Sequence, residues 1–216
     1  MIKNIFWDMD GTIIDSSPGI CESLRATCLR LGYHEPEYSV LRSCIGPPFS
    51  DSLIPILNIR EEDVDKFIAT YREIYDSGQY KNCVFYKGVE DAIKRLAATG
   101  YSLTLASSKN EKACNLIMDY LGIDKYFTSV VGSSMDRRVE TKAEVIEECF
   151  ARAPWQKKDE TILIGDTAFD VIGAIKGGIT PVAVTYGFSD EDKLREAGAN
   201  LIFDSIDDVV KYIESH

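Results

Sequence analysis

Two aspartates near the start of the chain are the first residues whose spacing suggests chemistry. The motif Asp8-Met9-Asp10-Gly11-Thr12 directly follows a short apolar segment, and its glycine permits a tight turn. Neighbouring carboxylates repel each other strongly at low dielectric, so a divalent cation stabilises such a pair. Mg²⁺ prefers hard oxygen ligands of this kind. The motif therefore predicts a magnesium site with Asp8 and Asp10 among its ligands, and a plain polar turn is the alternative.

A second pair of acids, Asp166 and Asp170, follows the apolar segment 161–164. We interpret Asp166 as a metal ligand because it lies just beyond the end of a predicted strand. Asp170 has two interpretations. It can hold a metal-bound water or orient a ligand, or it can complete a capping box with Thr167 at the start of a helix, which requires no functional role. Both acids are candidate metal residues.

Two further positions suit the binding of an anion. Ser107 and Ser108 lie between a predicted strand and a predicted helix, where a hydroxyl group and helix amides bind a phosphate oxygen. Ser108 and Asn110 also fit a plain helix cap. Lys142 follows a predicted cap at Thr141 and occupies a first helical turn, where the helix dipole disfavours a cation. Such a lysine either faces an anion or a group of carboxylates, or it is an ordinary surface lysine.

Short apolar segments alternate with segments of helical periodicity over most of the chain. This alternation predicts an α/β fold with a parallel sheet covered on both faces. In such sheets the ligand crevice lies beyond the carboxyl ends of the strands, where the candidate residues are found. The predicted strands are residues 2–7, 101–106, 129–131, 161–164 and 181–184, and the predicted helices include 89–98, 111–121 and 143–151.

One segment interrupts the alternation. Between residues 16 and 81 the apolar positions recur at helical spacing around 24–31, 49–57 and 64–75, with no convincing strand between them. We therefore expect residues 1–15 and 82–216 to form the core domain and residues 16–81 to form an all-helical insertion. Because the insertion follows the first acidic motif directly, it is placed to act as a lid that excludes water during chemistry.

Composition restricts the partners and the compartment. The 216 residues, 45% of them hydrophobic, suit one core domain with a smaller insertion. A net charge of −11 and the absence of a basic stripe argue against a nucleic-acid polymer, but they admit a small phosphate ester. The apolar segments are too short to cross a bilayer, and no secretory leader opens the chain. Six scattered cysteines without a Cys-x-x-Cys pair favour a reducing cytoplasm.

Taken in chain order, the motif at residues 8–12, Ser107, Lys142 and the motif at residues 165–170 (Gly-Asp-x-x-x-Asp) resemble the signature of the haloacid dehalogenase superfamily. The similarity covers nearly the whole chain. It implies a Rossmann-like, three-layer α/β core with an inserted all-helical cap, in agreement with the insertion that the periodicity predicts.

The resemblance also implies a role for each residue. Asp8 is the nucleophile that forms an aspartyl-phosphate, and Asp10 is the general acid and then the general base. Ser107 and Lys142 bind the phosphate, while Asp8, Asp166 and a backbone oxygen of the first motif surround Mg²⁺. The other substrate-binding residues that it implies are Gly11, Thr12, Ser108 and Lys109.

Within the superfamily, residues 45–48 (Ile-Gly-Pro-Pro), residues 86–89 (Tyr-Lys-Gly-Val) and Lys109 are similar to the phosphoglycolate phosphatase-like branch, especially its bacterial 5'-nucleotidase-like members. The sequence departs from that pattern at Ser134, Arg137 and Ala143, where an acidic residue, a glycine and a proline are usual. The resemblance predicts a Mg²⁺-dependent phosphatase that hydrolyses a small phosphate monoester, such as phosphoglycolate, a nucleotide or a sugar phosphate.

Two alternatives remain open at this stage. A phosphomutase of the same superfamily uses the same aspartyl-phosphate, and a non-catalytic module only holds Mg²⁺ and phosphate. A dehalogenase is disfavoured because the relatives with that chemistry do without the second acid, which is present here as Asp10. We expect the protein to be a monomer or a homodimer.

Overall fold

The computed structural model describes residues 1–46, 49–136 and 138–216. Pro47, Pro48 and Arg137, which the branch comparison uses, lie outside the described residues. The chain divides into two compact units, one of Met1–Asp15 with Phe85–His216 and the other of Ser16–Val84. The periodicity predicts an insertion at residues 16–81, and the second compact unit spans Ser16–Val84. No helix in the described parts of the chain is long and apolar enough to cross a membrane.

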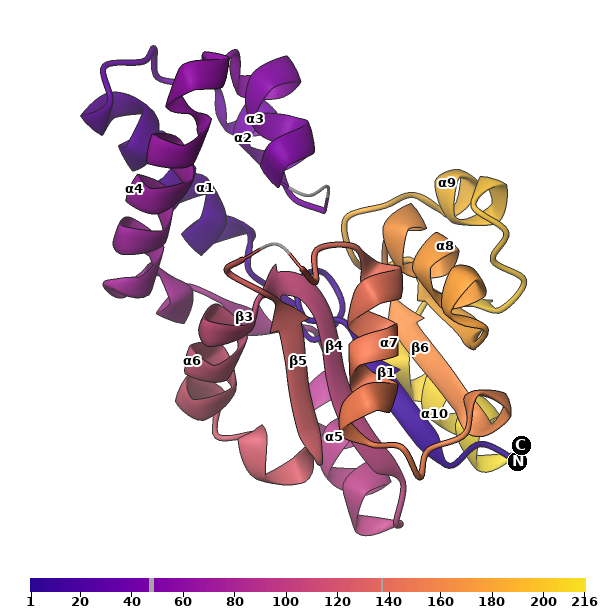
Figure 1. Ribbon diagram of the computed structural model, residues 1–216. Helices are drawn as coiled ribbons and strands as arrows, with labels where there is room; N and C mark the ends of the chain where they lie inside the picture. Colours follow the sequence, from indigo (N-terminus) through magenta and orange to yellow (C-terminus); the bar gives the residue numbers. More distant parts are fainter. Residues whose placement is uncertain (47–48, 137) are drawn as a thin grey trace. The chain divides into compact units, whose positions relative to one another are not determined.

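The first unit contains a six-stranded sheet in which every neighbouring pair is parallel. Figure 1 shows α7 and α8 on one face of this sheet and α5 and α10 on the other, so the predicted α/β fold is confirmed. The strands lie in the order β5 (Ser129–Ser133), β4 (Ser102–Asn110), β1 (Asn4–Trp7), β6 (Thr161–Gly165), β7 (Thr180–Val184) and β8 (Ile202–Phe203). The helices of this unit are α5 (Val89–Ala98), α6 (Glu111–Leu121), α7 (Lys142–Arg152), α8 (Ala168–Gly177), α9 (Glu191–Glu196) and α10 (Ile206–Glu214).

Strand β1 lies in the middle of the sheet and positions the first acidic motif. All of its residues are buried, as expected for a parallel strand covered on both faces. Trp7 pairs with Leu105 of β4 and Ile164 of β6. Because the three strands are parallel and in this register, the residues that follow them meet at one edge of the sheet. Asp8 and Asp166 are therefore brought to the same place.

Strand β4 is longer than the sequence predicts. It continues from Ser102 to Asn110, with an irregularity in its pairing to β5 between Ala106 and Asn110. Ser107 and Ser108 thus belong to the irregular end of a strand and not to a helix cap. Asn110 does cap helix α6, because its side chain accepts a hydrogen bond from the Lys112 amide. A separate two-stranded sheet pairs β2 (Ile14–Asp15) with β3 (Val84–Phe85).

The second unit is helical. Helices α1 and α4 pack together, and the buried residues of α4 are Phe67, Tyr71 and Tyr75. The rings of Tyr71 and Tyr75 stack with their centroids 5.6 Å apart. The helices of this unit are α1 (Ser17–Arg30), α2 (Tyr38–Ser43), α3 (Phe49–Leu57) and α4 (Val64–Asp76). Of these, only α2 has no counterpart in the predicted helices.

Candidate active site

Asp8 lies directly after β1, and the ammonium group of Lys142 holds its side chain. The Asp8 amide donates to the Ile164 carbonyl over 2.9 Å, which continues the sheet by one residue. The Nζ atom of Lys142 lies 2.7 Å from Asp8 Oδ1, 2.8 Å from Asp170 Oδ1 and 2.8 Å from the Ala106 carbonyl oxygen. An ammonium group has three N–H donors, so each donor of Lys142 has an acceptor in this arrangement.

Lys142 is buried at the start of helix α7, and two local features place it there. Thr141, the predicted cap, forms a capping box with Glu144, which starts the helix at Lys142. Gly173 of α8 lets the two helices approach, because a Cβ atom at that position would lie 2.5 Å from Lys142 Cβ. Burial disfavours the ammonium ion, yet Asp170 and Asp8 raise the pKa of Lys142 above its usual value. These two carboxylates offset the helix dipole that disfavours a cation here.

Asp166 and Asp170 are both buried next to this ion pair. Asp166 accepts hydrogen bonds on both oxygens, from the Thr12 hydroxyl to Oδ1 over 2.9 Å and from the Phe188 amide to Oδ2 over 2.8 Å. Of the two interpretations of Asp170, the structure shows the helix cap, and it adds an ion pair with Lys142. Its Oδ2 atom completes the capping box with Thr167, while its Oδ1 atom contacts Lys142.

The residues present fit a divalent cation. Asp8, Asp166 and Asp170 each offer a carboxylate oxygen within 4.8 Å of the others. Burial, with Asp170 adding repulsion and Lys142 opposing it, raises the pKa of Asp8 to about 6. Burial and then repulsion from Asp170 and Asp8 raise the pKa of Asp166 well above its usual value. When ionised, these three carboxylates outnumber the single ammonium group of Lys142, and a divalent cation such as Mg²⁺ suits such a set of oxygen ligands.

Asp10 is not part of this group of three acids. Both oxygens of its carboxylate contact the Nζ atom of Lys109, at 3.2 and 3.0 Å. The pair is largely enclosed, with side-chain exposures of 18% for Asp10 and 9% for Lys109. The structure therefore pairs two predicted site residues with each other, and the carboxylate of Asp10 lies outside the cluster that suits a metal.

The remaining predicted residues surround the same edge of the sheet. Ser107 is buried and its hydroxyl oxygen accepts from the Lys109 amide over 3.3 Å, and Ser108 beside it is half-buried. Gly11 adopts a φ of +87°, and a Cβ atom there would lie only 2.1 Å from Asp166 Oδ2. Only glycine suits this turn. Thr12 is buried and its hydroxyl is engaged with Asp166.

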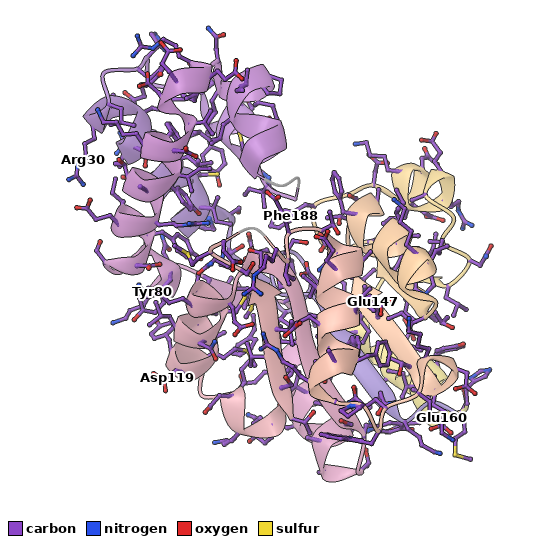
Figure 2. All side chains as sticks on the ribbon, in the orientation of Figure 1. Arg30, Tyr80, Asp119, Glu147, Glu160 and Phe188 are labelled. Atoms are coloured by element: carbon purple, nitrogen blue, oxygen red, sulfur yellow. The ribbon has the colours of Figure 1, made fainter. Side chains whose placement is uncertain are left out.

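Two backbone groups of the site were not identified from the sequence. The Phe188 amide and the Ala106 carbonyl both contact charged site residues, and backbone groups leave no side-chain signature in a sequence. Figure 2 places Phe188 at the end of the core unit where the strands end. Tyr186, two residues earlier, donates its hydroxyl to the Thr12 carbonyl over 3.1 Å. The segment after β7 is therefore part of the site.

Comparison with known proteins agrees with this geometry. The family described as haloacid dehalogenase-like hydrolase matches residues 5–184. A 5'-nucleotidase of Pseudomonas aeruginosa is 31% identical, covering 89% of this chain and 86% of that protein. Pyrophosphatase PpaX of Halalkalibacterium halodurans is 27% identical, covering 98% of this chain and 97% of that protein. Other relatives are named phosphoglycolate phosphatase.

A solved structure shows the same relationship. The crystal structure described as a predicted phosphatase from Clostridium acetobutylicum superposes with a TM-score of 0.92 at 32% identity, and the match covers 100% of both chains. These similarities confirm the resemblance that the motifs indicate. The chain therefore belongs to the haloacid dehalogenase-like hydrolase family, as an enzyme of its phosphatase group.

Proposed function

We propose that this protein is a Mg²⁺-dependent phosphatase that hydrolyses a small phosphate monoester through an aspartyl-phosphate on Asp8. The environment of Asp8 carries this proposal. Its Oδ1 atom is held by Lys142, two further acids lie beside it, and its Oδ2 atom accepts no hydrogen bond from the residues that the structure describes. A buried carboxylate with one oriented oxygen and one that is left to react suits nucleophilic attack.

In the first step, Oδ2 of Asp8 attacks phosphorus, and the bond from phosphorus to the leaving oxygen breaks. Asp10 in its protonated form gives a proton to the leaving alkoxide, and the proton that it takes up in the second step restores this form. In the second step, Asp10 takes a proton from water, and the resulting hydroxide displaces phosphate from Asp8. The Lys142 ammonium lies against Asp8 and offsets negative charge during both steps. Asp8, Asp166 and Asp170 would hold Mg²⁺, which would help to neutralise the charge on the phosphoryl oxygens.

Hydrolysis of a generic aryl phosphate tests this proposal through its metal dependence. Treatment with EDTA is expected to lower the rate by about 10²-fold or more, because the acidic cluster then repels the anionic substrate. Excess MgCl₂ is expected to restore the rate, and EDTA that is already saturated with Mg²⁺ serves as the control. Full activity in the chelated protein, with metal content checked by mass spectrometry, would contradict the metal dependence.

The ion pair of Lys109 with Asp10 leads to a second prediction. In Lys109→Met the Asp10 carboxylate loses both contacts with the ammonium group, so its orientation toward the leaving oxygen is lost. We expect kcat to fall by about 10–100-fold, a size typical of a misplaced catalytic group. Lys112→Met, at an exposed position on α6, is the matched control. Equal kcat values for the Lys109 variant and the wild type would remove Lys109 from the mechanism.

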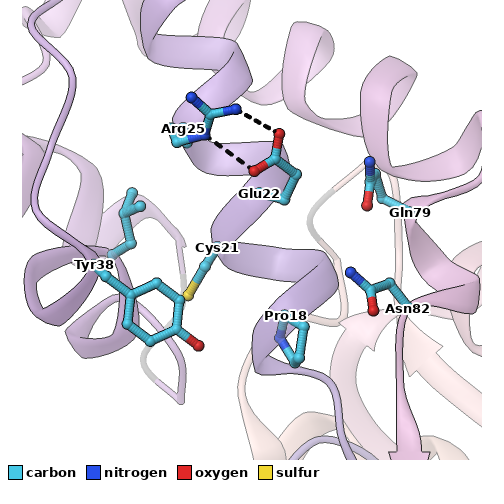
Figure 3. Close-up of a pocket in the computed structure, with 8 residues that line it drawn as sticks. Pro18, Cys21, Glu22, Arg25, Tyr38, Gln79 and Asn82 are labelled. Carbon is cyan, nitrogen blue, oxygen red and sulfur yellow. Dashed lines mark hydrogen bonds and ion pairs between the residues drawn. The ribbon is translucent and has the colours of Figure 1, made fainter.

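We further propose that the helical unit acts as a cap that influences substrate choice. This unit contains a hollow of about 440 Å³, lined by a tyrosine ring, a thiol, two carboxamides and the ion pair of Glu22 with Arg25 (Figure 3). Such a lining combines an apolar surface with groups that donate and accept hydrogen bonds. The residues concerned include Tyr38, Cys21, Gln79 and Asn82.

A substrate panel tests this role of the hollow. We expect Tyr38→Ala to change the ratio of kcat/KM between nucleoside monophosphates and phosphoglycolate by about fivefold, because an aromatic contact contributes about 1 kcal/mol. Tyr120→Ala, which removes an exposed tyrosine from α6, is the control. An unchanged ratio would exclude the hollow from substrate choice. A hexose 1-phosphate that is isomerised without release of phosphate would instead indicate a mutase.

The cytoplasm and a monomeric or dimeric state are also proposals, supported by the scattered cysteines and the moderate size of the chain. Cell fractionation and sedimentation test them directly. A protein recovered outside the reducing compartment, or a larger oligomer, would contradict them.

A further inference from the structure

The segment that follows strand β7 contacts Asp166 from its backbone. The Phe188 amide donates to Oδ2 of this carboxylate over 2.8 Å, and the Thr12 hydroxyl donates to Oδ1 over 2.9 Å. Both oxygens of a fully buried acid thus have a hydrogen-bond donor. Because the two donors come from segments far apart in the chain, they restrict rotation of the carboxylate about its side-chain bonds.

Gly187 lies between these contacts, and no other residue fits there. A Cβ atom at this position would lie 2.3 Å from Asp166 Oδ2 and 2.4 Å from the Gly11 carbonyl oxygen. The backbones of Gly187 and Gly11 therefore both pack directly against the same carboxylate. Gly187 is not among the glycines with positive φ, so it is required for space and not for its backbone conformation.

Tyr186 connects the segment to the first acidic motif. Its hydroxyl donates to the Thr12 carbonyl over 3.1 Å, and the centroid of its ring lies 4.9 Å from that of the Tyr86 ring. Burial, followed by repulsion from Asp166, raises the pKa of Tyr186, which keeps its phenol protonated as a donor. This hydrogen bond connects the turn at residues 10–12 to the segment after β7.

We propose that the segment 186–188 is a positioning element for the metal site, which holds the Asp166 carboxylate and the adjacent turn in the arrangement that Mg²⁺ needs. This inference rests on the proposed magnesium site. Tyr186 and Gly187 act through Asp166 and Thr12, so they are positioning residues. Substitution of groups that orient metal ligands in this way typically lowers metal affinity by about 10–100-fold.

Calorimetric titration of metal-free protein with MgCl₂ tests the proposal without relying on activity. We expect Gly187→Ala to weaken Mg²⁺ binding by about tenfold or more, because its new methyl group displaces the Asp166 carboxylate. Tyr186→Phe, which keeps the ring and loses one hydrogen bond, is expected to weaken binding by about threefold. Thr185→Val is the matched control, because the Thr185 hydroxyl bonds to Asp204 and not to the site. It is expected to bind Mg²⁺ like the wild type.

Thermal melts of the metal-free variants separate positioning from simple stabilisation. A Gly187 variant with a lower Tm but an unchanged Mg²⁺ affinity would overturn the proposal, since the segment would then be only structural. If Gly187→Ala does not fold, Tyr186→Phe decides between the two outcomes by the same titration. A wild type that binds no Mg²⁺ would instead overturn the proposed metal site, and this inference with it. A wild type that binds Mg²⁺, with the same affinity in both variants, would overturn the inference alone.

Discussion

Asp8→Asn is expected to reduce phosphate ester hydrolysis by about 10⁴-fold or more, the size typical of losing a nucleophile. An amide has nearly the shape of the carboxylate and still offers an oxygen to Lys142, but it does not attack phosphorus. The substitution should not destabilise the folded protein. Asp8 is ionised against burial and against repulsion from Asp170, so the neutral amide relieves part of that cost. We therefore expect a Tm equal to or above that of the wild type.

Steady-state rates and acid-quench peptide mapping together test this prediction. The wild type, quenched during turnover, is expected to carry phosphate on the peptide that contains Asp8, and Asp8→Asn to carry none. Asp91→Asn, at an exposed position in the first turn of α5, is the control and should keep full activity. A covalent phosphate found on another residue, or wild-type rates in the Asp8→Asn variant, would rule out Asp8 as the nucleophile.

The helices that the sequence predicts well are those whose first and last residues are marked by capping residues in the sequence. Helix α6 begins and ends where the periodicity predicts, with Asn110 as its N-cap and Gly122 in the left-handed conformation at its C-terminal end. The short elements were missed. Helices α2 and α9 have six residues each and β8 has two, too few to show a period.

The convergence of the site was predictable for a topological reason. Asp8 and Asp166 follow adjacent parallel strands, so any correct assignment of β1 and β6 brings them together. Electrostatics drew attention to Lys142, because the helix dipole disfavours a cation in a first helical turn, but it left a surface lysine as the alternative; the structure shows that Lys142 is buried against Asp8 and Asp170.

Other features of the site depend on tertiary packing and leave no local signal. The pairing of Asp10 with Lys109 joins residues 99 positions apart, and nothing in either motif specifies it. The double role of Asp170 also appears only when helices α7 and α8 pack, because one oxygen caps its own helix while the other contacts Lys142. Backbone donors such as the Phe188 amide are invisible in a sequence for the same reason.

Lys142→Met is expected to destabilise the metal-free protein by about 3–5 kcal/mol at pH 8, because it leaves Asp8 and Asp170 buried without their cation. The loss should be smaller at pH 5. Lys142 lowers the pKa of Asp8, so its removal raises that pKa further above about 6. At pH 5 Asp8 is then protonated, and the variant does not bear the cost of burying an unpaired carboxylate. Urea denaturation at the two pH values measures the difference. Hydrolysis should fall as well, by about 10³-fold, since the charge next to the nucleophile is lost.

A double-mutant cycle shows whether this loss arises from the buried carboxylates. Asp170→Asn removes one of the two acids, so in the Lys142→Met background it should restore part of the stability, and the two effects should not add. Lys158→Met is the matched control, because Lys158 makes an ion pair of the same 2.7 Å length with Glu147 at the exposed surface. Its removal should cost less than about 1 kcal/mol. Two results would contradict this explanation: an equal loss of stability in both lysine variants, or additive effects of the Lys142 and Asp170 substitutions. Either result would show that Lys142 does not stabilise the fold by pairing with the buried carboxylates.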